Sequence, residues 1–269
     1  MVQFENVEFE EIAPIIVSFR KRNRIVFSNY FGVPPCVDLG MCVSNNTLLI
    51  RKKEYEAYRL FFMTSDLMDL KQMLSDCVGS FFVMNIPTRE PIDDKIGLIK
   101  DCGFEFVAEY NRYFNKSIEK GYQKLETLSS SLTNDENHLL VCNAVEDDII
   151  PIWKILDETF DLYTDHIPNE IELKEMVKQH HVFINKTCDG EIFGVHIFTP
   201  TNHLCYGNAW VDKKGYGVLL SKNMYRYALD HGIKTLNYWI RRGNNQVIKY
   251  HKMLGAVPDG LSDYSFIKK

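Results

Sequence analysis

The segment Trp210-Val-Asp-Lys-Lys-Gly-Tyr-Gly-Val-Leu-Leu220 decides how the second half of this chain is expected to fold. An apolar strand runs into a turn that holds Lys213, Lys214, Gly215 and Gly217, and the turn opens directly into an amphipathic helix. Glycines let backbone N–H groups approach a ligand, and a helix N-terminus offers unpaired donors and a positive dipole end. The turn is therefore predicted to bind a phosphate group, with an ordinary surface turn as the alternative.

Three elements are predicted after this turn. The helix over 218–231 ends at His231-Gly232, which is a glycine stop signal. The segment Ile233-Lys-Thr-Leu-Asn-Tyr-Trp-Ile240 is typical of a buried strand. Residues 244–255 form a short helix closed by Gly255.

This succession resembles the GNAT superfamily of acyl-CoA-dependent N-acyltransferases. In that family the turn after the fourth strand has the form Arg/Gln-x-x-Gly-x-Gly/Ala and binds the pyrophosphate of coenzyme A; here it is Asp212-Lys-Lys-Gly215-Tyr-Gly217, which departs at the first position. A later family segment has the form Asn-x-x-Ala-Ile-x-x-Tyr-x-Lys-x-Gly-Phe. Its positions are occupied here by Asn244, Val247, Ile248, His251, Met253, Gly255 and Ala256, with departures at His251, Met253 and Ala256.

The resemblance covers about residues 138–269. There the expected order is strand, two helices, three strands, helix, strand, helix and strand, which is the GNAT arrangement. The family fold implies that the fourth and fifth strands splay apart, so that the pantetheine arm of the cofactor lies between them.

The first half of the chain parallels the second. Asp101-Cys-Gly103-Phe104 and the strand-like 110–114 match Met253-Leu-Gly255-Ala256 and 263–266, with an offset of 152 residues between the glycines. Chance matching is the alternative. The expected fold class is α/β (α+β), with two GNAT-like domains in tandem, each a mixed, mostly antiparallel sheet flanked by helices.

The N-terminal copy lacks the phosphate turn. Its corresponding segment, Met63-Thr-Ser-Asp-Leu-Met-Asp-Leu70, has two carboxylates and no glycine, and carboxylates compete for the donors that a phosphate needs. Residues 1–118 are therefore predicted to be a degenerate GNAT-like domain that does not bind coenzyme A. The polar, serine-rich segment 119–137 is predicted to be a linker, and residues 138–269 the acyl-CoA-binding domain.

The resemblance also implies roles for individual residues. The expected cofactor-binding residues are Trp210, Val211, Lys213, Lys214, Gly215, Tyr216, Gly217, Val218 and Asn244, with a backbone N–H near Trp210 or Val211 serving the thioester carbonyl. His251 stands where the family has its proton-donating tyrosine, with Tyr250 beside it. Because an ordinary imidazole pKa is near 6.5, His251 could serve as the acid, and its replacement is expected to lower kcat more than that of Tyr250. The alternative is that His251 caps or packs the helix and that Tyr250 or solvent donates the proton. Glu158, Asp165 and His166 are candidates for the base, with ordinary helix capping as the alternative for the last two.

Composition limits the classes of partner. The net charge of −5 and the sequence pI of about 5.9 give no electrostatic footprint for nucleic acid. No apolar run approaches the length of a membrane span, and the first residues lack the features of a signal peptide, so a cytoplasmic location is expected. The seven cysteines are scattered singly, which predicts reduced thiols and no metal site.

The leading interpretation is an N-acyltransferase that uses acetyl-CoA to acetylate a primary amine of a small molecule or peptide. One alternative is an aminoacyl-tRNA-dependent transferase of the Fem or lysyl-phosphatidylglycerol synthase type, against which the acidic charge argues, because tRNA binding depends on phosphate neutralisation. Another is a non-catalytic acyl-CoA-binding module, which the departures at Asp212 and His251 favour.

Overall fold

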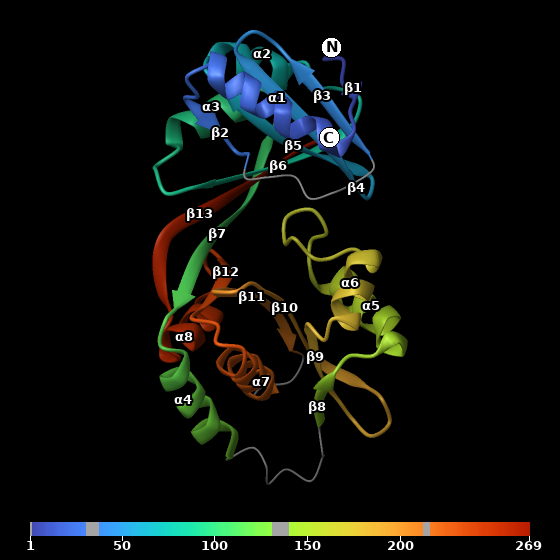
Figure 1. The fold of residues 1–269 in the computed structure, drawn as a ribbon, viewed down its shortest axis with the longest axis vertical. Coiled ribbons are helices and arrows are strands. Elements are labelled where there is room, and N and C mark those ends of the chain that lie inside the picture. The colour runs from blue at the N-terminus through green and yellow to red at the C-terminus, as the bar shows by residue number, and fades with distance from the viewer. Residues whose placement is uncertain (1, 31–37, 131–139, 212–215) are drawn as a thin grey trace. The chain divides into compact units, whose positions relative to one another are not determined.

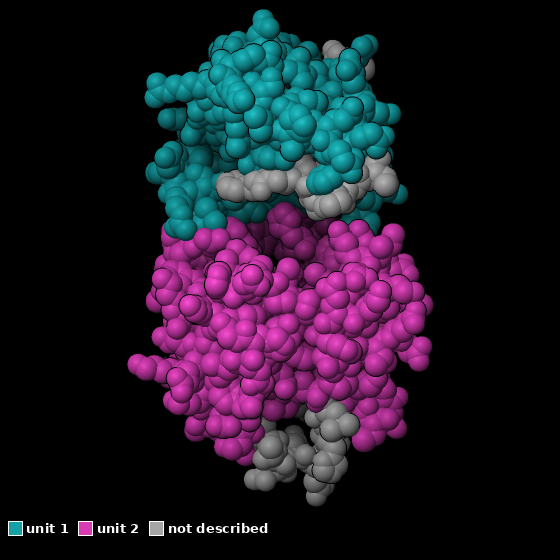
Figure 2. Space-filling view, in the orientation of Figure 1, with its two compact units in different colours: residues 1–109, 261–269 teal, residues 110–260 magenta. Residues whose placement is uncertain are grey.

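The computed structural model describes residues 2–30, 38–130, 140–211 and 216–269. The chain divides into two compact units (Figure 2): unit 1 comprises residues 1–109 and 261–269, and unit 2 comprises residues 110–260. Each is a mixed sheet with helices packed on it, which confirms the predicted fold class. Among the described residues, no helix is both long and apolar enough to span a membrane.

Unit 1 contains a six-stranded path in the order β1-β3-β4-β5-β6-β13, with the short β2 paired to β5 (Figure 1). Its complete elements are β1 (Glu5–Asn6), α1 (Phe9–Arg22), β2 (Phe27–Ser28), β3 (Leu39–Val43), β4 (Thr47–Glu54), β5 (Ala57–Thr64), α2 (Leu67–Ser75), β6 (Phe81–Thr88) and α3 (Asp93–Asp101). All pairs are antiparallel except β5 with β6, where Ala57 to Leu60 run parallel to Phe81 to Met84.

Unit 2 contains the order β7-β12-β11-β10-β9-β8 (Figure 1). Its complete elements are α4 (Ile118–Ser130), β8 (Leu140–Asn143), the 3₁₀ turn η1 (Glu146–Asp148), α5 (Ile149–Thr159), α6 (Glu170–Lys178), β9 (Val182–Lys186), β10 (Ile192–Pro200), β11 (Leu204–Val211), α7 (Tyr216–Asp230), β12 (Thr235–Arg241) and α8 (Asn245–Met253). Among the described strand pairs of unit 2, only β11 and β12 run in parallel.

Strand alternation divides the core of unit 2 between the two faces of its sheet. Val195 and Ile197 of β10 pack with α5 and α6 on one face. The next residue, Phe198, packs with α4, α7 and α8 on the other, together with Leu236 and Tyr238 of β12. These faces are called the α6 face and the α7 face below.

Two strands cross the boundary between the units. The last part of β7 (Glu105–Asn115) pairs with β12 in unit 2, from Tyr110 opposite Arg241 to Asn115 opposite Leu236. The last part of β13 (Val257–Lys268) pairs with β6 in unit 1, from Ser262 opposite Thr88 to Lys268 opposite Phe82. The compact units therefore differ from the sequence halves 1–118 and 138–269, whose status as independent domains stays a prediction.

The segment predicted as a linker is largely helical. Helix α4 covers 118–130, and residues 131–139 lie outside the described part of the chain. The helix buries Ile118, Leu125 and Gly121, and a side chain at Gly121 would overlap the Tyr225 ring. The polar composition concealed this helix because only a narrow stripe of it is buried, and the packing of α7 against that stripe could not be read from local sequence.

The repeat predicted at an offset of 152 residues is visible in the elements. Helix α3 spans 93–101 and helix α8 spans 245–253, and the strands that follow begin at 105 and 257. Gly103 and Gly255 both have positive φ, at 86° and 99°, as expected for glycines that end helices.

Candidate active site

The central feature of unit 2 is an open strand edge. Strand β11 pairs with β10 along one edge, from Cys205 to Val211. On its other edge β11 pairs with β12 only at Leu204, Cys205 and Tyr206, which lie opposite Thr235, Leu236 and Asn237. Among the described residues, Gly207 to Val211 have no strand partner on this edge. The two strands thus separate beyond Tyr206, as expected for the fourth and fifth strands of the family.

The register shows which peptide groups of β11 face the opening. Leu204 bonds toward β10, because its carbonyl accepts from the Thr201 N–H at 2.7 Å and its N–H donates to Thr201 Oγ1 at 3.0 Å. Backbone groups alternate along a strand, so those of Ala209 and Val211 face the opening and those of Trp210 face β10. The sequence analysis named Trp210 or Val211 for the thioester carbonyl. In this register the N–H of Val211 faces the opening, and so does that of Ala209, which the sequence analysis did not name. The N–H of Trp210 faces β10 instead. These orientations follow from strand pairing and could not be predicted from the sequence.

Helix α7 starts directly beyond this edge. It begins at Tyr216, and the predicted turn residues Lys213, Lys214 and Gly215 lie outside the described residues. At Gly217 an added Cβ would stand 3.5 Å from Val211 Cγ2, so the first helical turn adjoins the end of β11. Val218 packs against the core of the α7 face.

Helix α8 brings Tyr250 to the same place. Its hydroxyl lies 3.4 Å from the Gly217 carbonyl oxygen, in the first turn of α7. Burial raises the pKa of Tyr250 to about 12. The phenol therefore keeps its proton at neutral pH and can donate it to a group bound at the opening.

His251 lies deeper than Tyr250. Its ring packs on Tyr238 of β12, with ring centroids 4.0 Å apart, and its Nδ1 is buried without a hydrogen-bond partner. Burial, with a smaller effect of His196, lowers the pKa of His251 to about 3. The imidazole is neutral at neutral pH, so the reason for ranking His251 above Tyr250 no longer holds.

Asn244 has a structural function in the fold. Its side-chain oxygen accepts a hydrogen bond from the Val247 N–H at 3.3 Å and caps helix α8. The role in cofactor binding that the resemblance implied stays a prediction.

A pocket of about 320 Å³ opens on the α6 face of unit 2. Its lining comes from the loop before α6, from α6 itself and from the neighbouring strands β10 and β11: His166, Pro168, Glu172, Met176, Ile197, Thr199 and Tyr206. Tyr206 belongs to the last parallel pair, so the pocket lies beside the point where β11 and β12 separate. The sequence analysis identified His166 but not the strand residues, which resemble any other strand interior.

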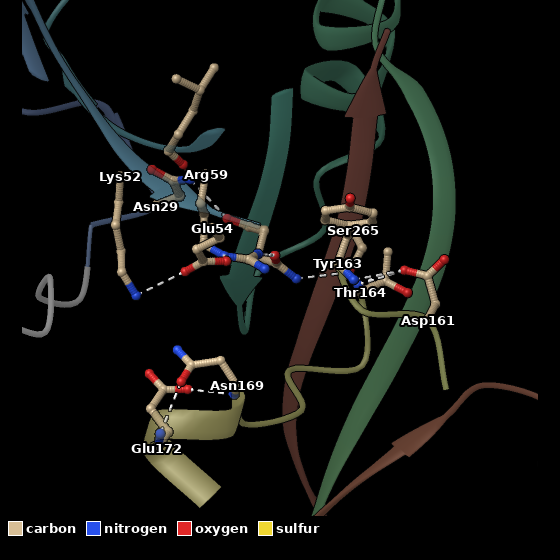
Figure 3. Close-up of polar contacts among 12 residues, drawn as sticks. Asn29, Lys52, Glu54, Arg59, Asp161, Tyr163, Thr164, Asn169, Glu172 and Ser265 are labelled. Atoms are coloured by element: carbon tan, nitrogen blue, oxygen red, sulfur yellow. Dashed lines mark hydrogen bonds and ion pairs between the residues drawn. The ribbon is translucent and has the colours of Figure 1, made fainter. Parts of the chain in front are cut away.

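Hydrogen bonds hold the loop before α6 in place. Asp165 accepts a hydrogen bond from the Tyr110 hydroxyl and another from the Asp161 N–H at 2.8 Å. Asp161 in turn accepts from the Thr164 N–H at 2.9 Å (Figure 3). Asp165 thus takes part in the hydrogen bonds of the loop, and the next residue, His166, has the left-handed φ of 52°. Asp165 therefore has a structural role in the loop before the helix. Of these two candidate bases, His166 lines the pocket.

The start of α6 and the third candidate base also have hydrogen-bond or ion-pair partners. Asn169 and Glu172 form a reciprocal cap at the start of α6, with both bonds at 2.9 Å (Figure 3). Asn169 is thus the N-cap of that helix. Glu158, the third candidate base, is exposed and lies 3.8 Å from Lys154 in an ion pair on α5.

The described cysteines and possible metal ligands are scattered over the fold. No group of three or more His, Cys, Asp or Glu side chains is placed to hold a metal ion among those residues. The six described cysteines are free, and burial raises the pKa of Cys77 and of Cys205 to about 12. Those two thiols therefore stay protonated at neutral pH.

Comparison with known proteins supports the fold and leaves the reaction open. No protein-family model matches the chain, and no curated protein is similar to it in sequence. Solved structures do match over its whole length. A tandem GNAT protein from the clavulanic acid biosynthesis pathway aligns with 99% of this chain and 98% of its own, at 9% identity and a TM-score of 0.58.

Two further structures agree. An acetyltransferase of the GNAT family from Colwellia psychrerythraea covers 99% of this chain and 100% of its own, at 12% identity and a TM-score of 0.54. A GCN5-related N-acetyltransferase from Sphaerobacter thermophilus covers 88% and 82%, at 10% identity and a TM-score of 0.54. The chain therefore has the tandem GNAT fold, as the sequence resemblance implied.

Proposed function

We propose that unit 2 is an acetyl-CoA-dependent N-acetyltransferase and that unit 1 does not bind the cofactor. The observation that carries the proposal is the open edge of β11, which leads from Gly207 to Val211 into the glycine-containing start of α7. An extended pantetheine arm fits such an edge, and the helix start suits the pyrophosphate.

The proposed reaction uses groups near this edge and in the neighbouring pocket. The acceptor amine attacks the thioester carbonyl, the N–C bond forms and the C–S bond breaks. The N–H of Ala209 or Val211 stabilises the oxyanion, and Tyr250 donates its proton to the leaving thiolate. His166 lines the pocket from which the amine approaches, and takes the proton that the amine loses.

The test is cofactor binding by the whole chain. Acetyl-CoA at 100 times its dissociation constant should stabilise unit 2 by about 2.7 kcal/mol and raise its Tm by about 5–10 °C. The tryptophan fluorescence reports on unit 2, because Trp153, Trp210 and Trp239 all belong to it.

Two variants of one residue make the test specific. Gly217→Glu places a carboxylate at the start of α7 and should abolish the shift, because it repels the pyrophosphate. Gly217→Ala is the matched control: its methyl group would stand at an ordinary 3.5 Å from Val211, and binding should survive. An unchanged shift in Gly217→Glu would show that the phosphate site has been assigned to the wrong helix.

A further inference from the structure

Asn237 of β12 is a buried amide with an unused donor. The residue is 3% exposed, and its Nδ2 has no hydrogen-bond partner. It lies opposite Tyr206 of β11 in the last parallel pair and opposite Phe114 of β7 on its other side. Asn237 therefore stands at the base of the opening between β11 and β12.

The side chain of Asn237 belongs to the α6 face. Its neighbours Leu236 and Tyr238 both pack in the core of the α7 face. Side chains alternate along a strand, so Asn237 points to the opposite face, as does its register partner Tyr206, which lines the pocket. Adjacent strands lie about 5 Å apart, so Asn237 stands directly beside Tyr206, behind the described residues that line the pocket.

An unpaired donor at such a place is costly. Leaving a buried N–H without a partner destabilises a protein by about 1–3 kcal/mol, and buried polar groups are otherwise almost always bonded. A ligand oxygen that accepts from Nδ2 would remove this cost when it binds.

The pocket itself restricts the charge and size of its occupant. Of the seven described residues that line it, Glu172 carries a carboxylate and none is lysine or arginine. Pro168, Met176 and Ile197 give it apolar walls. Its volume is at the small end of the range for ligand pockets, about 300–1,000 Å³. A small amine without a negative charge fits these properties, whereas a carboxylate or phosphate would meet the Glu172 carboxylate with no lysine or arginine among the described lining residues.

We propose that Asn237 donates a hydrogen bond from Nδ2 to a carbonyl or hydroxyl oxygen of the acceptor. The acceptor class is then a small primary amine that carries such an oxygen and has no carboxylate or phosphate. This inference rests on the proposed function for the identity of the ligand as an acceptor, while the binding preference belongs to the pocket alone.

The experiment measures amine binding to the full chain by ligand-observed NMR, with and without coenzyme A. Three probes of matched length are compared: 4-aminobutanamide, pentylamine and 4-aminobutanoate. The amide should bind about 10–100-fold more tightly than the alkylamine, because one buried hydrogen bond is gained, and the carboxylate should bind least. In Asn237→Leu, which has a similar volume but no donor, the amide and alkylamine should agree within about threefold.

Two other variants keep the outcome interpretable. Asn143→Leu makes the same change at an exposed position of β8 and should leave the preference intact. Asn237→Ser is used if Asn237→Leu does not fold, and it should weaken the preference in the same direction.

Each result decides the proposal. An undiminished preference for the amide in Asn237→Leu would overturn it, as would tightest binding of the carboxylate or no binding of any probe by the unsubstituted chain. If acetyl-CoA fails to bind but the Asn237-dependent amine preference is present, the proposed acetyl transfer is wrong and the amine site stands.

Discussion

Both units contain two parallel strands that separate, but a further strand occupies the opening in unit 1 and no described strand occupies it in unit 2. In unit 1, β5 and β6 run parallel from Ala57 to Leu60 and then part, as β11 and β12 part after Tyr206 in unit 2. Strand β4 covers one edge of β5 along its whole length, so β2, which pairs with Thr64 and Met63, must occupy the edge that faces the opening. In unit 2 no described strand takes that place.

Asn29 completes the closure of unit 1. Its Nδ2 donates to the Leu60 carbonyl at 3.0 Å on β5 and to the Asn85 carbonyl at 2.9 Å on β6, and its Oδ1 accepts from the Phe62 N–H at 2.6 Å. One buried side chain thereby bonds both separated strands (Figure 3 shows Asn29). The hydrogen-bonding groups that a pantetheine arm would need are already used.

The helices beside the two openings also differ in the groups that they leave available to a ligand. Helix α2 is capped by Asp66, whose carboxylate accepts from the Met68 N–H at 2.8 Å, so a donor that could bind phosphate is satisfied internally. At the offset of 152, the positions of Tyr250 and His251 are held in unit 1 by Leu98 and Ile99, which pack in its apolar core. We therefore expect the opening of unit 1 not to bind the cofactor, because its strand edge is paired, its helix start is capped and its facing helix lacks the tyrosine.

The largest expected effect comes from removing the hydroxyl that unit 1 lacks. Tyr250→Phe should lower kcat by about 10²–10³-fold, because the leaving thiolate loses its proton donor, while acetyl-CoA binding stays nearly intact. His251→Gln should have the smaller effect on kcat, since the ring is already neutral. The ranking is measured by coenzyme A release with an accepted amine, and a larger loss in His251→Gln would return the role to the imidazole.

Next in size is the loss of the side chain that closes unit 1. Asn29→Ala should destabilise unit 1 by about 2–4 kcal/mol, because it leaves buried carbonyl and N–H groups without partners. Labelling of the buried Cys77 and Cys102 in urea reports this unfolding. The exposed Asn45→Ala should change nothing. The variant should still not bind acetyl-CoA in unit 1, because Asp66 remains; binding there would show that β2 and Asn29 alone exclude the cofactor.

The smallest expected effect is the loss of stability of unit 2 at low pH. All histidines of the chain lie outside unit 1. Burial lowers the pKa of His196 to about 4 and that of His251 to about 3, so the unfolded state takes up protons first as the pH falls below about 6.5. The stability of unit 2 is thus fully present above pH 6.5 and is lost toward pH 3–4, by up to about 1.4 kcal/mol per pH unit for each histidine.

His251→Gln should remove about one histidine's share of this slope. Urea unfolding followed by tryptophan fluorescence at pH 7.0, 6.0 and 5.0 measures it in unit 2. If the free energy of unfolding depended equally on pH in the variant and in the unsubstituted chain, the His251 ring would be exposed to solvent rather than buried.

Local sequence signals predicted two helices of unit 2 and the repeat. Glycine stops and apolar periodicity predicted the helices over 218–231 and 244–255 within a few residues, and the match at Gly103 and Gly255 predicted the repeat. These features are fixed by neighbouring residues, which is why a single sequence carries them.

Features that depend on residues far apart in the chain could not be predicted from the sequence. Helix α4 depends on the packing of Gly121 against Tyr225, and the orientation of Ala209 and Trp210 depends on strand register. The burial of His251 and the unpaired amide of Asn237 likewise depend on residues far away along the chain. Each feature depends on a tertiary contact, and none produces a periodic pattern in the local sequence.

The crossing of β13 into unit 1 has a consequence for how the chain folds as it is made. The edge of β6 is paired by residues 262–268, which are synthesised after all of unit 2, although nearly all other residues of unit 1 are made before it. The edge of β6 therefore stays unpaired while unit 2 is synthesised, and an unpaired strand edge favours aggregation. Asn85 donates to Asp263 at 2.9 Å and to Ser265 at 2.8 Å, so β13 completes the sheet of unit 1 only after unit 2 has been made.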